Sequence, residues 1–249
     1  MATTELVAAP ARQTRQGGIR SVATFVTTTR LGATEAVSFL SDGCTFPQPA
    51  IGLCYGEVVE DDKTSTGIDT IDAISEPFAL YAGVECGIVE GSSADYAERA
   101  RNLLEGGVDR VLEERLATWA AGGTALTAGS SLTDALAIVD NALDDDYPGQ
   151  GVILMNRGDA VRASAEGSLD WSLDGTPTTV NGTPVIASSR VDAGAVLGVG
   201  AITVLHTNVE TFPGVDFRTN RDWQVAESVY AIIVDCELRV VSAVEVEGV

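Results

Sequence analysis

Apolar residues recur every three to four positions between Ser92 and Gly123, and the charged residues of this segment fall on the opposite face. This spacing predicts one long amphipathic α-helix. Ser92 or Ser93 is suited to cap its first turn, and Gly122-Gly123 is suited to end it. At roughly 1.5 Å per residue the helix spans about 40 Å, which predicts a scaffold element. The stripe consists of Tyr96, Ala100, Leu103, Leu104, Val108, Val111, Leu112, Leu116 and Trp119.

Upstream of this helix the chain is poor in apolar residues. The first 36 residues predict an extended or partly ordered arm, and residues 38–51 predict a loop. Gly52–Val59 and Phe78–Val84 flank a polar turn and predict the strands of a long hairpin. This hairpin has too little apolar surface to pack on its own chain alone.

Downstream, short helices and strands are expected. Ser131 and Asp134 form a capping-box-like start for a helix that ends at Asp144-Asp145-Asp146, and residues 157–165 predict a further helix. Asn181-Gly182 predicts a type I′ turn. The expected strands are Val152–Met155, Pro184–Ser188, Ile202–Leu205, Val229–Val234 and Leu238–Val244.

The charge of the chain and its uneven distribution indicate which partners the chain can bind. The net charge is −21, from 36 acidic and 15 basic residues, which disfavours tight binding to a nucleic-acid backbone. The first 34 residues carry Arg12, Arg15, Arg20 and Arg30 against Glu5 alone. This basic stretch is either an arm that lies on the acidic body of another copy or an uncommitted disordered tail.

Residues suited to catalysis or metal binding are scarce. The four cysteines lack C-x-x-C spacing and the only histidine is His206, so we expect buried free thiols and no zinc site. There is no nucleophile elbow, P-loop, dinucleotide fingerprint or calcium loop. The sequence has no apolar run that predicts a membrane span, and its polar N-terminus lacks a secretory signal, so we expect synthesis in a cytoplasm. We therefore expect no catalytic, cofactor-binding or metal-binding residues.

The order of elements resembles the major capsid proteins of tailed bacteriophages, whose fold encapsulins share. Two stretches strengthen the resemblance: Gly175–Val191, in which Gly182-Thr183-Pro184-Val185 opens a strand, and Phe217–Val246, in which Arg221-Asp222-Trp223-Gln224-Val225 opens the strands beside the helix. The resemblance implies an α+β fold. Its parts would be an N-terminal arm (1–48), an extended loop (49–88), a peripheral domain with the spine helix (89–130 and 207–249) and an axial domain (131–206).

The same resemblance implies a structural protein and no enzyme. It would assemble into pentamers and hexamers of an icosahedral shell around double-stranded phage DNA, bound without sequence specificity. Assembly would take place in the host bacterial cytoplasm, with scaffolding, portal and decoration proteins as further partners and no membrane. An encapsulin-like compartment shell and a small acidic enzyme or binding protein are the alternatives.

Six residues are candidates for contacts between subunits: Arg12, Arg15, Arg20, Arg30, Lys63 and Glu227. Some members of the family join subunits through a loop lysine and an asparagine of the C-terminal block. Lys63 lies at the predicted hairpin tip, but Glu227 occupies the asparagine position. We therefore expect Lys63 to contact a neighbour by charge and not through an isopeptide bond.

Overall fold

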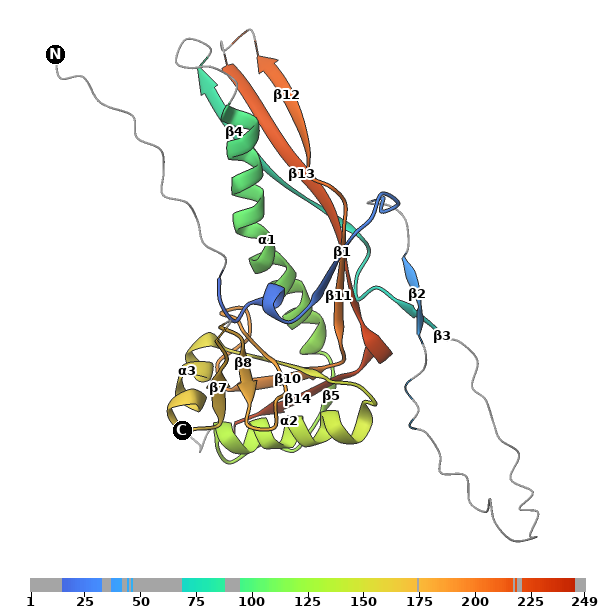
Figure 1. Ribbon diagram of the computed structural model, residues 1–249, viewed down its shortest axis with the longest axis vertical. Helices are drawn as coiled ribbons and strands as arrows, with labels where there is room; N and C mark the ends of the chain where they lie inside the picture. The colour runs from blue at the N-terminus through green and yellow to red at the C-terminus, as the bar shows by residue number, and fades with distance from the viewer. Residues whose placement is uncertain are drawn as a thin grey trace, which may run out of the picture.

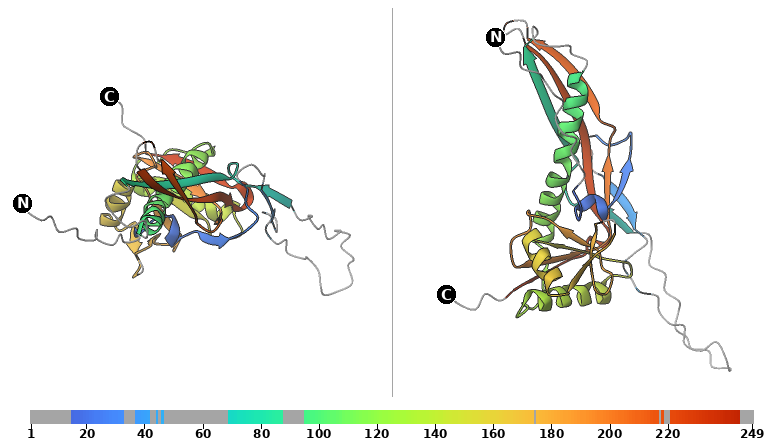
Figure 2. Two further views of the ribbon diagram at one scale, coloured as in Figure 1. Left: turned by 90° about the horizontal axis from the view of Figure 1, so that it is seen from above. Right: turned by 60° about the vertical axis from the view of Figure 1, so that its left-hand side comes forward.

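The computed structural model describes residues 15–32, 37–41, 44, 46, 69–87, 95–173, 175–216, 218 and 221–244. A long helix runs beside a tall sheet, and a second, compact sheet with two shorter helices lies at one end (Figures 1 and 2). Of the predicted features, Arg12, Lys63 and the strand at Gly52–Val59 lie outside the described residues.

The long helix is confirmed as α1 (Tyr96–Ala120), 25 residues and about 37 Å in length. It begins later than expected, with Asp95 rather than Ser92 or Ser93 at the N-cap position. Leu104, Val108, Leu112 and Leu116 of the predicted stripe are buried, whereas Leu103 is 39% exposed. The helix therefore packs on a stripe slightly rotated from the predicted one.

The first sheet is built around one strand of 14 residues, β13 (Arg221–Val234). One edge of β13 pairs with β4 (Phe78–Gly87) along ten residues. Its other edge pairs first with β12 (Glu210–Asp216) and then with β11 (Ile202–His206), and β1 (Thr24–Thr27) adds to β11 in parallel. Figure 1 shows β4, β13 and β12 rising along α1.

The second sheet has the order β5-β14-β10-β6-β9. Val152 and Leu154 of β6 lie in the core shared with α1, whereas Ile153 and Met155 face the core shared with α2. Both faces of β6 are covered, which explains its continuous apolar run. The strands are β5 (Thr124–Ala125), β6 (Val152–Met155), β9 (Val185–Ala187), β10 (Ala195–Val199) and β14 (Arg239–Ala243).

Two helices and a small strand pair complete this part. Both helices lie where predicted: α2 (Leu132–Asp146) and α3 (Arg157–Ala165). The Ser131 side chain caps α2 by accepting from the Asp134 N–H, as expected. The small pair is β7 (Leu169–Trp171) with β8 (Pro177–Thr179). Both sheets combine strands from more than one of the expected domain ranges. The first sheet includes β4, from the expected extended loop, and the second includes β14, from the expected peripheral domain.

The predicted turn at Asn181-Gly182 is present but is not type I′. Only Gly182 has a positive φ, at +93°, whereas a type I′ turn needs positive φ at both central residues. The Gly182 N–H donates to the Thr179 carbonyl, and the Thr179 N–H donates to the Thr183 carbonyl. The connection is therefore a three-residue loop that ends on a left-handed glycine.

The strand expected at Phe78–Val84 is present as β4, whereas its expected hairpin partner, Gly52–Val59, lies outside the described residues. Among the residues that the structure describes, Phe78–Gly87 pairs with β13, where its alternate side chains pack on α1. Upstream of β4, β2 (Ser38–Ser41), in a range expected to be loop, pairs with β3 (Asp69–Asp72). Apolar content alone did not reveal β2, because its four residues are Ser-Phe-Leu-Ser.

The expectation of free thiols is wrong for two of the four cysteines. Cys44 and Cys236 form a disulfide with a Cα–Cα distance of 5.6 Å, although 192 residues separate them in the sequence. Cys236 lies in the 3-10 turn η3 (Asp235–Glu237) that links β13 to β14. The β2–β3 ribbon brings Cys44 to this turn, a proximity that the sequence spacing did not reveal.

Candidate functional site: the α1 junction and the exposed sheet face

A buried carboxylate on α1 joins three distant parts of the chain. Glu113 is 0% exposed. Its Oε1 accepts from the Arg15 guanidinium and from the Ile19 N–H at 3.1 Å, and its Oε2 accepts from Ser188 Oγ at 2.5 Å. A charge removed from water needs such partners, because its desolvation is otherwise uncompensated. Glu113 thus fastens residues 15–19 and the loop after β9 to α1.

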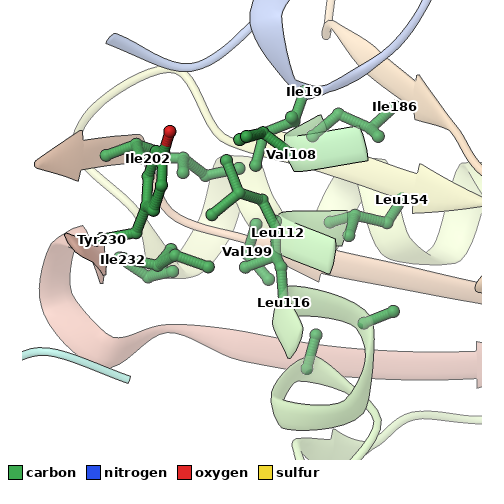
Figure 3. Packing of buried hydrophobic residues seen from close by; sticks show 14 of the residues in the cluster. Ile19, Val108, Leu112, Leu116, Leu154, Ile186, Val199, Ile202, Tyr230 and Ile232 are labelled. Atoms are coloured by element: carbon green, nitrogen blue, oxygen red, sulfur yellow. The ribbon is translucent and has the colours of Figure 1, made fainter. Parts of the chain in front are cut away.

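The N-terminal segment is seated closely at this junction. The Gly17 carbonyl accepts from the Ala187 N–H at 2.9 Å, at the edge of the second sheet. Gly17 has φ +68°, and a Cβ there would lie 3.1 Å from Pro177 and 3.2 Å from Trp171. Only glycine combines this backbone conformation with this space. Two residues later, Ile19 begins the turn η1 (Ile19–Ser21) and enters the core beside Val108 (Figure 3).

A second ion pair lies one helical turn away on α1. Arg20 Nε donates to Asp109 Oδ1 at 2.6 Å, and the guanidinium lies 4.9 Å from the Phe25 ring centroid. Burial raises the pKa of Asp109, and the charge of Arg20 opposes that rise. Arg15 and Arg20 therefore both bind acids on the same helix of their own chain.

The other candidate contact residues lie elsewhere. Arg30 follows β1 and is exposed, and its side chain has no ion-pair partner within the part of the chain that the structure describes. Glu227 lies on β13 between Tyr81 of β4 and Glu210 of β12. The structure thus brings Arg15 and Arg20 to α1 and leaves Arg30 and Glu227 away from that junction.

The face of the first sheet that points away from α1 carries exposed aromatic side chains. Tyr81 is 74% exposed, Phe212 46% and Trp223 38%. Strand register places them on one face. Phe212 of β12 and Gly83 of β4 both lie opposite Val225 of β13. Tyr81 and Trp223 are each two residues away from Gly83 and Val225 on their strands, so they share this face. A Cβ on Gly214 would lie 2.0 Å from the Trp223 ring, so this glycine lets the indole lie flat on the sheet. We call Tyr81, Phe212, Trp223 and Val225 the aromatic strip.

A cavity of about 320 Å³ lies beside Asp140. The Asp140 carboxylate accepts from Thr179 at 3.3 Å, Asn181 at 2.8 Å and Thr183 at 2.5 Å. These bonds hold the 179–183 turn, so the carboxylate is already used by the fold.

The described residues contain no group of three or more potential metal ligands. Within the same residues, no helix is long and apolar enough to cross a membrane. His206 packs against two rings, with centroids 6.0 Å from Tyr230 and 6.2 Å from Phe25. Its position is that of a packed side chain, as its place in a strand-like run predicts.

No protein-family model and no curated protein matches the sequence. Solved structures match in fold. The capsid of an empty GTA particle matches with a TM-score of 0.66 at 14% identity, over 99% of this chain and 95% of that chain. Gordonia phage Cozz matches with a TM-score of 0.60 at 13% identity, over 99% and 92%. The holo-SrpI encapsulin complex from Synechococcus elongatus matches with a TM-score of 0.55 at 13% identity, over 98% and 94%. The chain therefore has the fold of tailed-phage major capsid proteins, which an encapsulin shares.

Proposed function

We propose that this chain is a structural subunit that self-assembles into pentamers and hexamers of an icosahedral shell around double-stranded phage DNA. The observation that carries the proposal is the extent of the fold likeness. Shell subunits match it over 99% of this chain and over 92–95% of their own. The fold is thus matched as a whole, and the proposed role is that of the whole subunit and not of one domain.

The aromatic strip supports association of copies. Its side chains lie on a sheet face that α1 does not cover, so a lone chain leaves Tyr81, Phe212 and Trp223 exposed to water. Contiguous exposed apolar surface is typical of protein–protein interfaces, where tyrosine, phenylalanine and tryptophan are enriched. The proposed interfaces bury this strip.

The charge supports enclosure of DNA without adhesion to it. A subunit of charge −21 repels phosphate, so packed DNA would not be held by the shell wall. The proposal accordingly includes no sequence-specific DNA contact. It also includes no enzymatic activity, and assembly is proposed to take place in the host bacterial cytoplasm. Scaffolding, portal and decoration proteins are its further proposed partners.

The contacts proposed between subunits involve Arg12, Arg30, Lys63 and Glu227. Arg30 is exposed, and Glu227 lies directly opposite Glu210 on the sheet. Two like charges facing each other are unfavourable unless a cation lies nearby. An arginine from a neighbour would relieve this repulsion. Arg15 and Arg20, which bind α1 of their own chain, would act by holding the arm where it leaves the subunit.

The test is assembly of the purified chain. Light scattering and negative-stain microscopy should reveal closed particles, and boiled denaturing gels should give one band at 25.8 kDa. A single monomeric species at high concentration, across salt and pH, would contradict the proposal. A ladder of covalent oligomers would contradict the charge-only role of Lys63.

A compartment shell of the encapsulin kind is the second candidate, because the encapsulin complex matches with a TM-score of 0.55 over 98% of this chain. Particle content separates the two. Nuclease-protected DNA in particles from the producing cells supports the phage shell, and a stoichiometric protein cargo without DNA supports the compartment.

A further inference from the structure

The β2–β3 ribbon lies outside both main sheets, to the right of β11 and β13 in Figure 1. Its strands pair with each other, and Ser38 Oγ donates to Asp72 Oδ1 at 2.6 Å. At its base the Ile74 N–H donates to the Ile232 carbonyl at 2.9 Å, which ties it to β13. The ribbon is therefore attached to the body through few described hydrogen bonds.

The turn η3 offers a fixed anchor beside the ribbon. Cys236 and Glu237 have φ of 60° and 47°, a left-handed conformation that L-residues adopt only when their surroundings impose it. The Cys236 N–H donates to Asp235 Oδ1 at 3.0 Å, and the Tyr147 hydroxyl donates to Asp235 Oδ2 at 2.8 Å. The Asp235 N–H donates to the Ala201 carbonyl at 2.9 Å. Cys236 thus belongs to a turn held by α2 and by the β10–β11 connection.

The disulfide joins these two parts. Cys44 is exposed and Cys236 is half-buried, so a small thiol can reach the bond from solvent. We propose that Cys44–Cys236 is a redox-operated staple: oxidised, it fixes the ribbon to η3, and reduced, it releases the ribbon while both sheets stay folded. In a reducing compartment, where thiols stay reduced, the ribbon is free, and it is fastened when the surroundings become oxidising. This inference does not depend on shell assembly.

The chemistry is thiol–disulfide exchange with a small disulfide such as oxidised glutathione. One cysteine thiolate attacks the oxidant, forms a mixed disulfide and releases one glutathione thiolate. The second cysteine thiolate attacks the protein sulfur of that mixed disulfide and expels the other glutathione. The two cysteines lose two electrons and two protons in total, and the oxidant becomes two glutathione thiols. A dithiol reductant reverses the sequence.

The experiment compares the full chain after incubation with oxidised glutathione and after reduction. Non-reducing peptide mapping should find the peptides of Cys44 and Cys236 linked only in the oxidised sample. Amide hydrogen exchange in Ser38–Ser41 and Asp69–Asp72 should be at least about tenfold slower in the oxidised form. The disulfide then ties the ribbon to η3, and this suppresses local opening of the ribbon. Exchange in β10 and β14 should be the same in both.

Two variants provide the controls. Cys236→Ser should exchange like the reduced protein whatever the oxidant, and Cys86→Ser should respond to oxidant like the wild type. Absence of the linked peptide after oxidation would overturn the proposal. Equal ribbon exchange in the two redox states would also overturn it, and so would a reduction that accelerates exchange throughout both sheets.

Discussion

Ser188 Oγ donates to the buried carboxylate of Glu113 at 2.5 Å, across 75 residues of sequence. This bond joins α1 to the loop that follows β9. The opposite oxygen of the same carboxylate accepts from the N-terminal segment. One side chain thus bonds α1 both to the loop after β9 and to the start of the N-terminal segment.

Replacing that carboxylate tests the junction. Glu113→Gln keeps the size of the side chain and leaves Arg15 without its counter-ion. We expect a loss of about 2–3 kcal/mol in the free energy of unfolding, measured with urea on the unassembled chain. The neighbouring Glu114→Gln is the matched control. Glu114 is exposed, and its Oε2 lies 3.9 Å from Arg190 Nη1. The free energy of unfolding of this variant should therefore fall by less than about 0.5 kcal/mol. Equal losses in the two variants would contradict the role of Glu113.

The seat of the N-terminal segment is tested at Gly17. In Gly17→Ala the new Cβ would be placed on a left-handed backbone and would lie 3.1–3.2 Å from the rings of Pro177 and Trp171. We therefore expect a loss of about 2 kcal/mol in the free energy of unfolding. Gly167→Ala has a comparable φ of +78° but nothing within 4 Å, so it should lose only about 1 kcal/mol. The difference between the losses of Gly17→Ala and Gly167→Ala measures the packing of the segment against Pro177 and Trp171. Equal losses in the two variants would mean that the segment is not held there.

A phenol links α2 to η3 and gives a dependence on pH. Burial, followed by the hydrogen bond to Asp235, raises the pKa of Tyr147 from 10.0 to about 12. Since the folded pKa exceeds the unfolded one, this stabilisation is complete below pH 10 and is lost as pH rises toward 12. We expect Tyr147→Phe to be less stable than wild type by about 1 kcal/mol at about pH 9, because two hydrogen bonds are lost.

The difference between the two proteins should shrink when urea unfolding is repeated at about pH 11. Burial also raises the pKa of Tyr230, but that residue is present in both proteins, so its effect cancels in the comparison. A difference that stays constant between the two pH values would refute the assignment to Tyr147.

Regular elements were predictable because their own residues specify them. The α2 cap at Ser131 and the buried strand Val152–Met155 are local patterns, and both are confirmed. β1 (Thr24–Thr27) and β2 (Ser38–Ser41) were missed because each has only four residues, two of them polar, and because their pairing partners are distant in the sequence. Thr24 pairs with Thr203, and Ser41 pairs with Asp69. Non-local pairing of this kind leaves no periodic signal.

The junction at Glu113 was missed for a different reason. Glu113 shares a helix face with Ala117 and Ala120, both buried, at spacings of four and seven residues. The predicted stripe runs mostly through large apolar residues and omits Ala117 and Ala120, so it does not extend to the side of the helix that carries Glu113. A glutamate aligned with small residues at helical spacing was the available signal. Its partners Arg15, Ile19 and Ser188 belong to segments whose proximity only the fold reveals.

The aromatic strip gives the sharpest test of assembly. Tyr81 is 74% exposed, so the lone chain gains little from its ring. Tyr81→Ser should therefore change the free energy of unfolding of the unassembled chain by less than about 0.5 kcal/mol. Tyrosine is enriched among interface hot spots, whose truncation costs about 2 kcal/mol or more, and a shell repeats that loss at every subunit. We expect particle formation, measured by light scattering, to require at least about tenfold higher concentration of the variant. Val161→Ser, on α3 and 61% exposed, is the matched control and should assemble like the wild type. If Val161→Ser blocks assembly and Tyr81→Ser does not, the interface lies on α3 and not on the sheet face.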